Sequence, residues 1–276
     1  MTRLILTCLV LLSIFHWSCE KDPPTYTLIK PTESDRKVLV EEFSGALCPN
    51  CPQGTQDLEN LKAIYAENLI IVTIHAGDFA SPYPDSRYDF STEEGDQLLS
   101  ILGNPIGYPS AVVNRVKQGQ SFQSFASKWA SLVADELDKP AKVNISLVQT
   151  YDPETRILDL KATILPLEEI VDGIRLSVLI KEDGIIDPQA DRASPTGKVI
   201  DYVHKYVMRV MLSSPSGDLL TNYAEAFLPY EQSYQFTLPA EDGWWRADKC
   251  HLVVYASVDT EGSYEILQAH EEPLAQ

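Results

Sequence analysis

The sequence is poor in cysteine and in basic residues, and it has no long apolar run. Five cysteines stand among 276 residues, too few for a scaffold held together by several disulfides. The 22 Lys and Arg against 40 Asp and Glu give a formal net charge of -18. Because nucleic-acid binding depends on Lys and Arg that neutralise phosphates, this balance argues against a nucleic-acid partner. It also argues against electrostatic docking on anionic lipid.

The N-terminal segment indicates export and lipid attachment. Its apolar stretch covers residues 4–15, which is too short for a bilayer about 30 Å thick that needs about 20 residues. Residues 1–18 are therefore predicted to be a lipoprotein signal peptide. Ser18 directly before Cys19 resembles a lipoprotein processing site, at which Cys19 would carry the lipid. The two residues before Ser18 depart from the usual pattern, so cleavage without lipid and an uncleaved anchor stay open as alternatives.

The rest of the chain divides into a tether and two predicted domains. Residues 19–35 hold three prolines among polar residues, which is typical of an extended, solvated tether. The length that follows suggests two domains, over residues 36–139 and 140–276. The protein is thus expected in the cell envelope, as an outer membrane lipoprotein that faces the periplasm or the cell surface.

In residues 36–139, short continuous apolar runs alternate with segments whose apolar residues recur every three or four positions, as in a helix. Strands are predicted over residues 37–43, 69–75 and 110–116, and helices over residues 53–68, 91–102 and 122–137. Alternation of this kind predicts an α/β domain with a mostly parallel sheet.

After residue 140 the apolar period changes to two. Strands are predicted over residues 143–147, 158–164, 174–180, 233–238, 250–258 and 263–269. Short strands with turn signals between them predict an all-β domain, an antiparallel, Ig-like sandwich. Residues 185–230 have no firm assignment. Cys250 falls in an alternating strand, which favours a buried, inert thiol.

The Cys-x-x-Cys pair lies where the first strand meets the first helix. A helix N-terminus favours a thiolate, so this position would lower the pKa of Cys48 and make it the attacking sulfur. Cys51, one turn inside the helix, would resolve the mixed disulfide. The alternative is a permanent local disulfide that serves only as a staple.

This segment, together with the later sequence Gly-Tyr-Pro-Ser, resembles the thioredoxin fold. The resemblance implies that Pro109 is a cis proline facing the cysteines, and that Tyr108 offers its backbone to a bound substrate peptide. A trans proline entering an edge strand is the alternative. For Glu42, six residues before Cys48, the resemblance implies a buried acid that shuttles the proton of the resolving thiol. A charged residue that bridges to a neighbouring helix is the competing interpretation.

His75 and Asp78 follow the second strand of the predicted parallel sheet. Ligands gather at the carboxyl ends of such strands, so both residues are expected near Cys48. A protonated His75 would stabilise the thiolate and Asp78 would oppose it. The simpler interpretation, which we favour, makes His75 a half-buried residue at the strand end and Asp78 a turn residue.

The whole chain resembles the Omp28-related outer membrane lipoprotein family through residues 40–52 and 75–79. That resemblance implies a thioredoxin-like domain followed by a β-rich domain, with surface binding or adhesion as the suggested activity. Two functions are therefore open: thiol-disulfide exchange through Cys48 and Cys51, or surface binding with a structural disulfide. The expected partners are an envelope or extracellular protein with a disulfide or an exposed strand, and a membrane reached through Cys19. No cofactor and no metal are expected.

Overall fold

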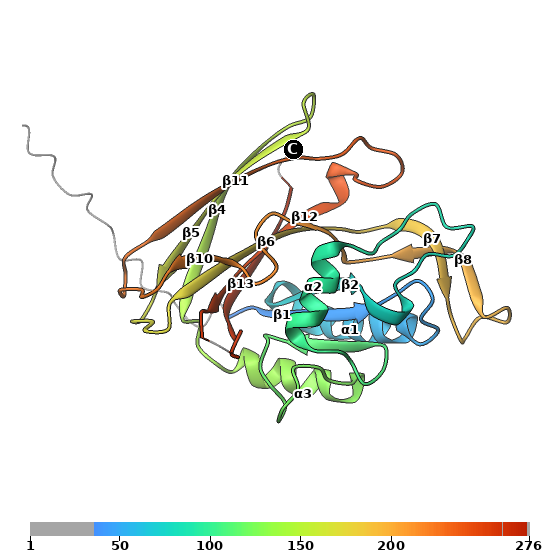
Figure 1. Cartoon of the computed structure of the whole chain (residues 1–276), viewed down its shortest axis with the longest axis horizontal. Helices are drawn as coiled ribbons and strands as arrows, with labels where there is room; N and C mark the ends of the chain where they lie inside the picture. Colours follow the sequence, from blue (N-terminus) through green and yellow to red (C-terminus); the bar gives the residue numbers. More distant parts are fainter. Residues whose placement is uncertain (1–35, 261, 275–276) are drawn as a thin grey trace, which may run out of the picture. The chain divides into compact units, whose positions relative to one another are not determined.

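Strands dominate the described part of the chain, residues 36–260 and 262–274 of a computed structural model (Figure 1). The helices are α1 (Cys51–Tyr65), α2 (Glu93–Leu102) and α3 (Ala126–Leu137), with short 3-10 turns η1 (Ala66–Asn68), η2 (Gly77–Phe79) and η3 (Ala247–Lys249). The predicted signal peptide, the tether and Cys19 lie outside the described residues. No helix within these ranges has the length and apolar character that a membrane crossing needs.

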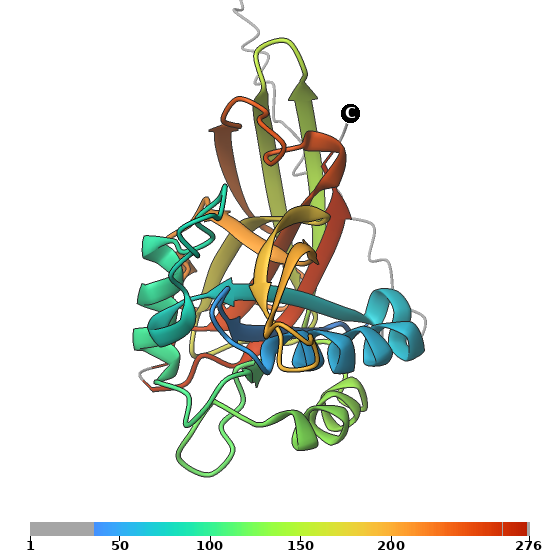
Figure 2. The ribbon, with the colours of Figure 1, turned by 90° about the vertical axis from the view of Figure 1, so that its right-hand side faces the viewer.

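The strands come from both halves of the chain. They are β1 (Val38–Ser44), β2 (Leu69–His75), β3 (Ser110–Val113), β4 (Val143–Asp152), β5 (Ile157–Pro166), β6 (Ile174–Glu182), β7 (Ile185–Ala190), β8 (Lys198–His204), β9 (Val207–Met211), β10 (Asp218–Thr221), β11 (Tyr230–Thr237), β12 (Cys250–Val258) and β13 (Ile266–Pro273). The main sheet has the order β13-β12-β6-β9-β2-β1-β3, and β10 also pairs with β6. Figures 1 and 2 show this sheet combining strands from the blue and the red ends of the sequence colours.

The predicted fold class, an α/β thioredoxin-like domain followed by an all-β sandwich, is wrong. The chain is mostly β, with 43% strand and 19% helix, and its sheets are mixed. Only β1 with β2, and β2 with β9 at Thr73 and Val207, pair in parallel in the main sheet. The spacing of apolar residues predicts where each strand lies in the sequence, but it does not predict which strands pair. The pairing of β9 with β2 joins residues far apart in the sequence. The predicted domain boundary between residues 139 and 140 stays a prediction. Strands from before and after this boundary pair with each other, as β2 and β9 do.

The continuous apolar run of β2 is explained by burial on both faces. All seven of its residues are buried. On one face, Ile71 packs in a cluster with Leu58 of α1 and Trp129 of α3. On the other face, Ile70 packs with Leu98 of α2. Helices thus cover both sides of the β1-β2-β3 region, which is why its strands lack alternation.

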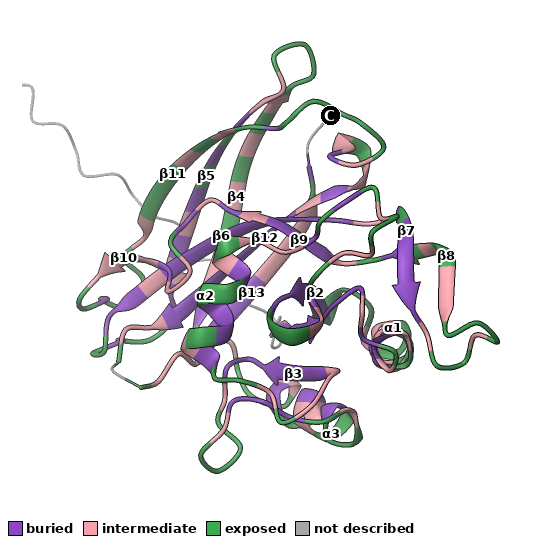
Figure 3. Cartoon of the chain, turned by 45° about the vertical axis from the view of Figure 1, so that its right-hand side comes forward, coloured by how far each residue is buried: buried purple, intermediate pink, exposed green. Residues whose placement is uncertain are grey.

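The second sheet, β11-β5-β4, packs against the other part of the main sheet. The burial of β5 alternates along the strand, and its inward residues Leu158 and Leu160 join one cluster with Val178 of β6 and Val254 of β12. The outward face is exposed or half-buried, as the burial colours of Figure 3 show for β4 and β11. This alternation is the period-two pattern seen in the sequence.

A buried ion pair ties the first strands to the last ones. Arg115, just after β3, donates from Nε and Nη2 to both carboxylate oxygens of Glu41 in β1, at 2.8 and 2.7 Å. Its Nη2 also donates to the Tyr255 hydroxyl of β12 at 2.7 Å. The side chains of Arg115 and Glu41 are 0% and 1% exposed. Each charge therefore depends on the other for compensation.

We predict that Arg115→Met destabilises the fold by about 3–5 kcal/mol, because Glu41 would be left as an unpaired buried charge. Urea denaturation measures the change. Arg246→Met is the matched control, since Arg246 pairs with Asp248 at an exposed site, where an ion pair contributes little. Equal stabilities for the two variants would contradict the prediction.

Candidate functional site

The two cysteines of the Cys-x-x-Cys pair form a disulfide at the start of α1. Cys51 is the first residue of this helix and Pro52 the second, and the Cα atoms of Cys48 and Cys51 lie 5.4 Å apart. The residues are only 1% and 2% exposed. The structure thus brings together the pair that the sequence indicated, but closes it off from solvent.

The cover over the disulfide is the β7–β8 hairpin (residues 185–204), which we call the covering hairpin. It is hydrogen-bonded to the backbone carbonyls of the loop that carries Cys48. The bonds run from Gln189 Nε2 to Gly45 O (3.1 Å) and Cys48 O (3.0 Å), from Ala190 N to Ala46 O (2.8 Å), and from Arg192 N to Pro49 O (2.9 Å). Gly45 O and Cys48 O also accept bonds from within the loop, from Cys48 N at 3.0 Å and Cys51 N at 3.4 Å. The hairpin adds a second bond to each of these two carbonyls and also binds Ala46 O and Pro49 O, so it is tied to the loop at four points.

The opposite side of the loop is held by the segment after β2. Leu47 N donates to Phe79 O at 3.1 Å. A Cβ atom on Gly45 would lie 2.1 Å from Phe79 O, so only glycine allows this approach. The same segment is fixed to the covering hairpin, since the carboxylate of buried Asp187 accepts from Arg87 N at 2.8 Å. The Cys48 loop is therefore clamped from two sides.

Pro109 and Tyr108 lie next to this region. The Tyr108–Pro109 peptide bond is cis, which confirms that part of the prediction. Pro109 packs on α1, because a Cβ on Gly54 would lie 2.5 Å from its Cγ. Tyr108 donates its hydroxyl proton to Ala76 O at 3.0 Å. Substrate binding by these two residues stays a prediction.

Glu42 is buried under the first turn of α1. Thr73 Oγ1 donates to its carboxylate at 2.9 Å, and Thr55 of α1 lies at 3.4 Å. Burial raises the pKa of Glu42 from its ordinary 4.5 to about 7, and the two threonines oppose this shift. The contact with Thr55 agrees with a bridge to a neighbouring helix, while the pKa near neutrality suits a proton carrier.

Of the two weaker candidates, His75 lies near the disulfide, where it lines a small cavity together with Cys51, and it is buried rather than half-buried as expected. His75 is buried at the end of β2, and burial, with a smaller effect of His204, lowers its pKa to about 3. Its ring lies 5.7 Å from that of His204, centroid to centroid. At neutral pH His75 therefore carries no charge to stabilise a thiolate. Asp78 lies exposed in η2.

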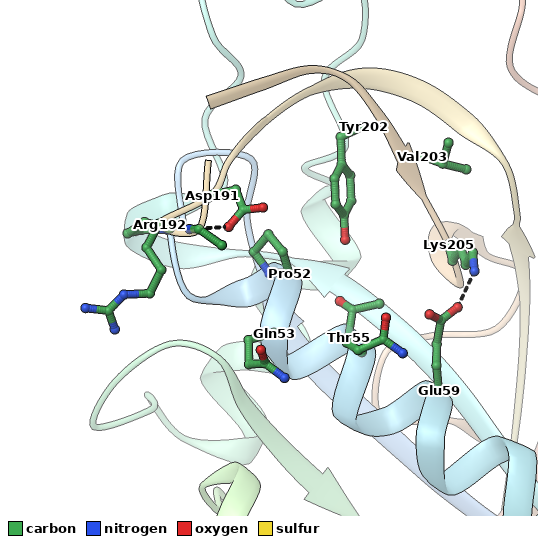
Figure 4. Close-up of a pocket in the computed structure, with 12 residues that line it drawn as sticks. Pro52, Gln53, Thr55, Glu59, Asp191, Arg192, Tyr202, Val203 and Lys205 are labelled. Atoms are coloured by element: carbon green, nitrogen blue, oxygen red, sulfur yellow. Dashed lines mark hydrogen bonds and ion pairs between the residues drawn. The ribbon is translucent and has the colours of Figure 1, made fainter. Parts of the chain in front are cut away.

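A cleft of about 480 Å³ opens beside the disulfide, between α1 and β8 (Figure 4). Tyr202 projects from β8 toward Thr55, and Lys205 forms an ion pair with Glu59 of α1. A small cavity of about 10 Å³ shares Thr55 and Tyr202 with the cleft and reaches Cys51. Tyr202 thus lines both the open cleft and the small cavity beside the disulfide.

The sequence did not identify four residues of this site, all from the unassigned stretch. They are Asp187, Gln189, Tyr202 and His204. A partial signal was present, since the pair Ile185-Ile186 and the β-branched residues of 198–204 stand on either side of the turn-forming sequence Ser-Pro-Thr-Gly at 194–197. That arrangement is typical of a hairpin.

Cys250 is the free cysteine of the described residues, and it lies in the interior. Cys250 is free and 1% exposed, and burial, followed by nearby Glu182, raises its pKa to about 12. This confirms the buried, inert thiol. Within the described ranges, no three His, Cys, Asp or Glu residues are grouped so as to hold a metal ion.

Comparison with known proteins identifies a family and a fold. Residues 103–272 match the family model described as outer membrane protein Omp28. This segment is more than half of the chain, and it excludes residues 40–52 and 75–79, on which the sequence resemblance depended. Among curated proteins, no sequence matches at a significant level.

Two solved structures resemble the chain. HBP35 of Porphyromonas gingivalis has a TM-score of 0.64 and 19% identity, over 89% of this chain and 77% of that one. Protein AGR_C_4864 from Agrobacterium tumefaciens has a TM-score of 0.54 and 13% identity, over 89% and 97%. At these identities the likeness concerns the fold alone.

We predict that Glu42→Gln removes a pH dependence of stability. Because the folded-state pKa of Glu42 is raised from 4.5 to about 7, its contribution is fully present below pH 4.5 and is lost as the pH rises through 7. The loss amounts to about 3 kcal/mol. The variant should therefore be more stable than the parent at pH 8, by up to that amount, in urea denaturation across a pH series. Parallel pH profiles for both proteins would contradict this.

Proposed function

The chain belongs to the outer membrane protein Omp28 family, and from this membership and the buried disulfide we propose that it is a lipid-anchored binding protein. The family places it in the cell envelope, at the outer membrane. Cys19 carries the lipid, and residues 20–35 tether the folded body to the membrane. The partner is an envelope or extracellular protein. Cys48–Cys51 is a structural disulfide.

The burial of both cysteines beneath the covering hairpin is the observation that supports a structural role. Thiol-disulfide exchange requires an incoming thiolate to reach a sulfur, and exposures of 1% and 2% leave no path for a protein thiol. Opening the hairpin breaks its four hydrogen bonds to the Cys48 loop, each with a net value of about 1 kcal/mol. A cost of about 4 kcal/mol corresponds to about one open molecule in a thousand.

The disulfide has a clear structural task in this account. It closes the loop from Cys48 to Cys51 and fixes the carbonyls of Cys48 and Pro49, which accept hydrogen bonds from Gln189 and Arg192. The same loop and hairpin border the cleft between α1 and β8. A fixed loop therefore gives the cleft a constant shape, which lowers the entropy cost of binding.

Thiol-disulfide exchange is a second candidate, favoured by one observation. Glu42, with a pKa of about 7, lies beside the first turn of α1, where Pro109 also packs. In this mechanism the reduced Cys48 thiolate attacks a partner disulfide and one partner sulfur leaves as thiolate. Cys51, deprotonated by Glu42, then attacks the mixed disulfide, so that the pair is oxidised and the partner disulfide reduced. Tyr108 and Pro109 would hold the partner strand.

We predict that the double variant Cys48→Ala/Cys51→Ala folds and keeps partner binding, but loses about 2 kcal/mol of stability, the value for a short closed loop. Urea denaturation measures the loss, and Cys250→Ala is the control that removes a thiol without touching the disulfide. When the Cys51→Ser variant is expressed in cells, no partner protein should be found linked to it by a disulfide. Adducts that depend on Cys48 would instead support exchange.

The lipid anchor is tested separately. Cys19→Ala should release the protein from the membrane fraction and abolish the mass added by the lipid, measured on the intact protein. A parent protein without added mass would identify ordinary cleavage or an uncleaved anchor and would contradict the lipoprotein proposal.

A further inference from the structure

A group of exposed apolar side chains lies at the end of β6 that is remote from the disulfide. Val171, Tyr223, Phe227 and Leu228 are 66%, 44%, 47% and 40% exposed. We propose that these residues, the apolar patch, are a docking surface for a protein partner whose contact site is apolar with a basic rim. The inference deepens the proposed binding role by naming the surface.

The patch residues come from two loops that are bridged to each other. Residues 167–173 and 222–229 are joined by an antiparallel bridge, in which Ile170 and Ala224 exchange two backbone hydrogen bonds of 3.0 Å. Val171 and Tyr223 each adjoin one of these bridged residues in the sequence. The loops beside β10 are coloured as exposed in Figure 3.

The loops are held rigidly although their apolar side chains face solvent. Phe227 N donates to Pro166 O at 2.8 Å, which fixes the tip of the second loop to the end of β5. The Tyr230 hydroxyl accepts from Glu225 N at 3.1 Å. A preformed surface loses little conformational freedom when a partner binds, so it is suited to recognition.

The backbone conformation of Phe227 is the observation in the patch that most favours a partner. Its φ of 65° lies in the left-handed region, which a bulky residue adopts at a cost of about 1–3 kcal/mol. Its side chain is only partly buried in return, since the residue is 47% exposed. A ring presented in a strained conformation is explained if a partner buries it.

Carboxylates surround the patch and define the partner. Glu168, Glu169, Asp172 and Glu225 are exposed. Glu168 lies 3.6 Å from Lys142, whereas the other three have no ion-pair partner within the described part of the chain. An apolar centre with a charged rim is the usual anatomy of an interface, and complementary charge selects the partner. The surface therefore fits a partner with Lys or Arg around an apolar contact.

The chain enters the described fold near this end, which makes a lipid bilayer the main competing occupant. Arg36 donates to Ile266 O at 2.9 Å, and Asp259, in the turn before that strand, lies within 3.4 Å of Gly173. The carboxylates oppose an anionic bilayer surface. A basic protein surface is thus the better match to the charge.

The patch is also independent of the disulfide. β6 begins directly after Gly173 and ends at Glu182, just before the covering hairpin. Nine residues of strand at about 3.3 Å each separate the two by about 30 Å. A change in the patch should therefore leave the Cys48 loop untouched, and its test does not depend on the anchor or the disulfide.

The probe is a short synthetic peptide that alternates Lys with Leu and Trp, titrated by fluorescence anisotropy against the full chain. We expect Phe227→Asn to weaken binding at least tenfold while thermal stability stays equal or rises, because Asn tolerates the left-handed conformation. Glu169→Gln/Glu225→Gln should weaken binding and reduce its salt dependence. Controls are Ile64→Asn, at an apolar site 71% exposed on α1, and Glu93→Gln/Glu94→Gln on α2; both should bind as the parent does.

Several outcomes would overturn the proposal. Equal weakening by the control variants would show that the peptide senses only the overall negative charge. A loss of stability in Phe227→Asn would assign the ring a structural role. Binding of phosphatidylcholine vesicles that depends on Phe227, without peptide binding, would identify a bilayer as the occupant, and concentration-dependent dimers lost in the variant would identify a second copy. Failure of this test leaves the anchor and disulfide predictions standing.

Discussion

The fold around the disulfide depends on one set of hydrogen bonds, those from the covering hairpin to the carbonyls of the Cys48 loop. Gln189, Ala190 and Arg192 satisfy backbone groups that lie buried between β1 and α1. Without them, Ala46 O and Pro49 O would lose the hydrogen bonds from Ala190 N and Arg192 N, each at a cost comparable to a lost hydrogen bond, and Gly45 O and Cys48 O would keep only the bonds from within the loop. The same contacts bury Cys48 and Cys51, so the stability of the loop and the inaccessibility of its sulfurs have a common cause.

Local features of this fold could be predicted from the sequence, and long-range ones could not. The strand over residues 69–75 has the predicted bounds, and the Cys48–Cys51 pairing and the cis bond before Pro109 are present. Each depends on neighbours in the sequence. The fold class was predicted wrongly because β9 inserts beside β2, and the cover over Cys48 comes from a hairpin about 140 residues later. Apolar periodicity contains no information about such partners.

Two regions of the molecule differ in the burial of their titratable groups. Near the disulfide, Glu42 and His75 are buried, and burial disfavours the charged form of each: it raises the pKa of Glu42 and lowers the pKa of His75. At the far end of β6, carboxylates are exposed around an apolar surface that includes the strained Phe227. The two regions therefore depend on unrelated interactions: buried polar groups near the disulfide, and an exposed apolar surface with carboxylates around it at the far end of β6.

The central claim is that Cys48–Cys51 is a structural disulfide closed off by the covering hairpin. Differential alkylation of the native protein, with increasing reductant and mass mapping of each cysteine, tests it most directly. Cys48 and Cys51 of the native parent should stay oxidised and unlabelled across the reductant series until urea unfolds the chain, whereas Gln189→Ala should allow both to be labelled in the native protein within that series. Reduction of the native protein at the concentration that reduces an unfolded control, with labelling of Cys48 first, would contradict the claim and favour exchange.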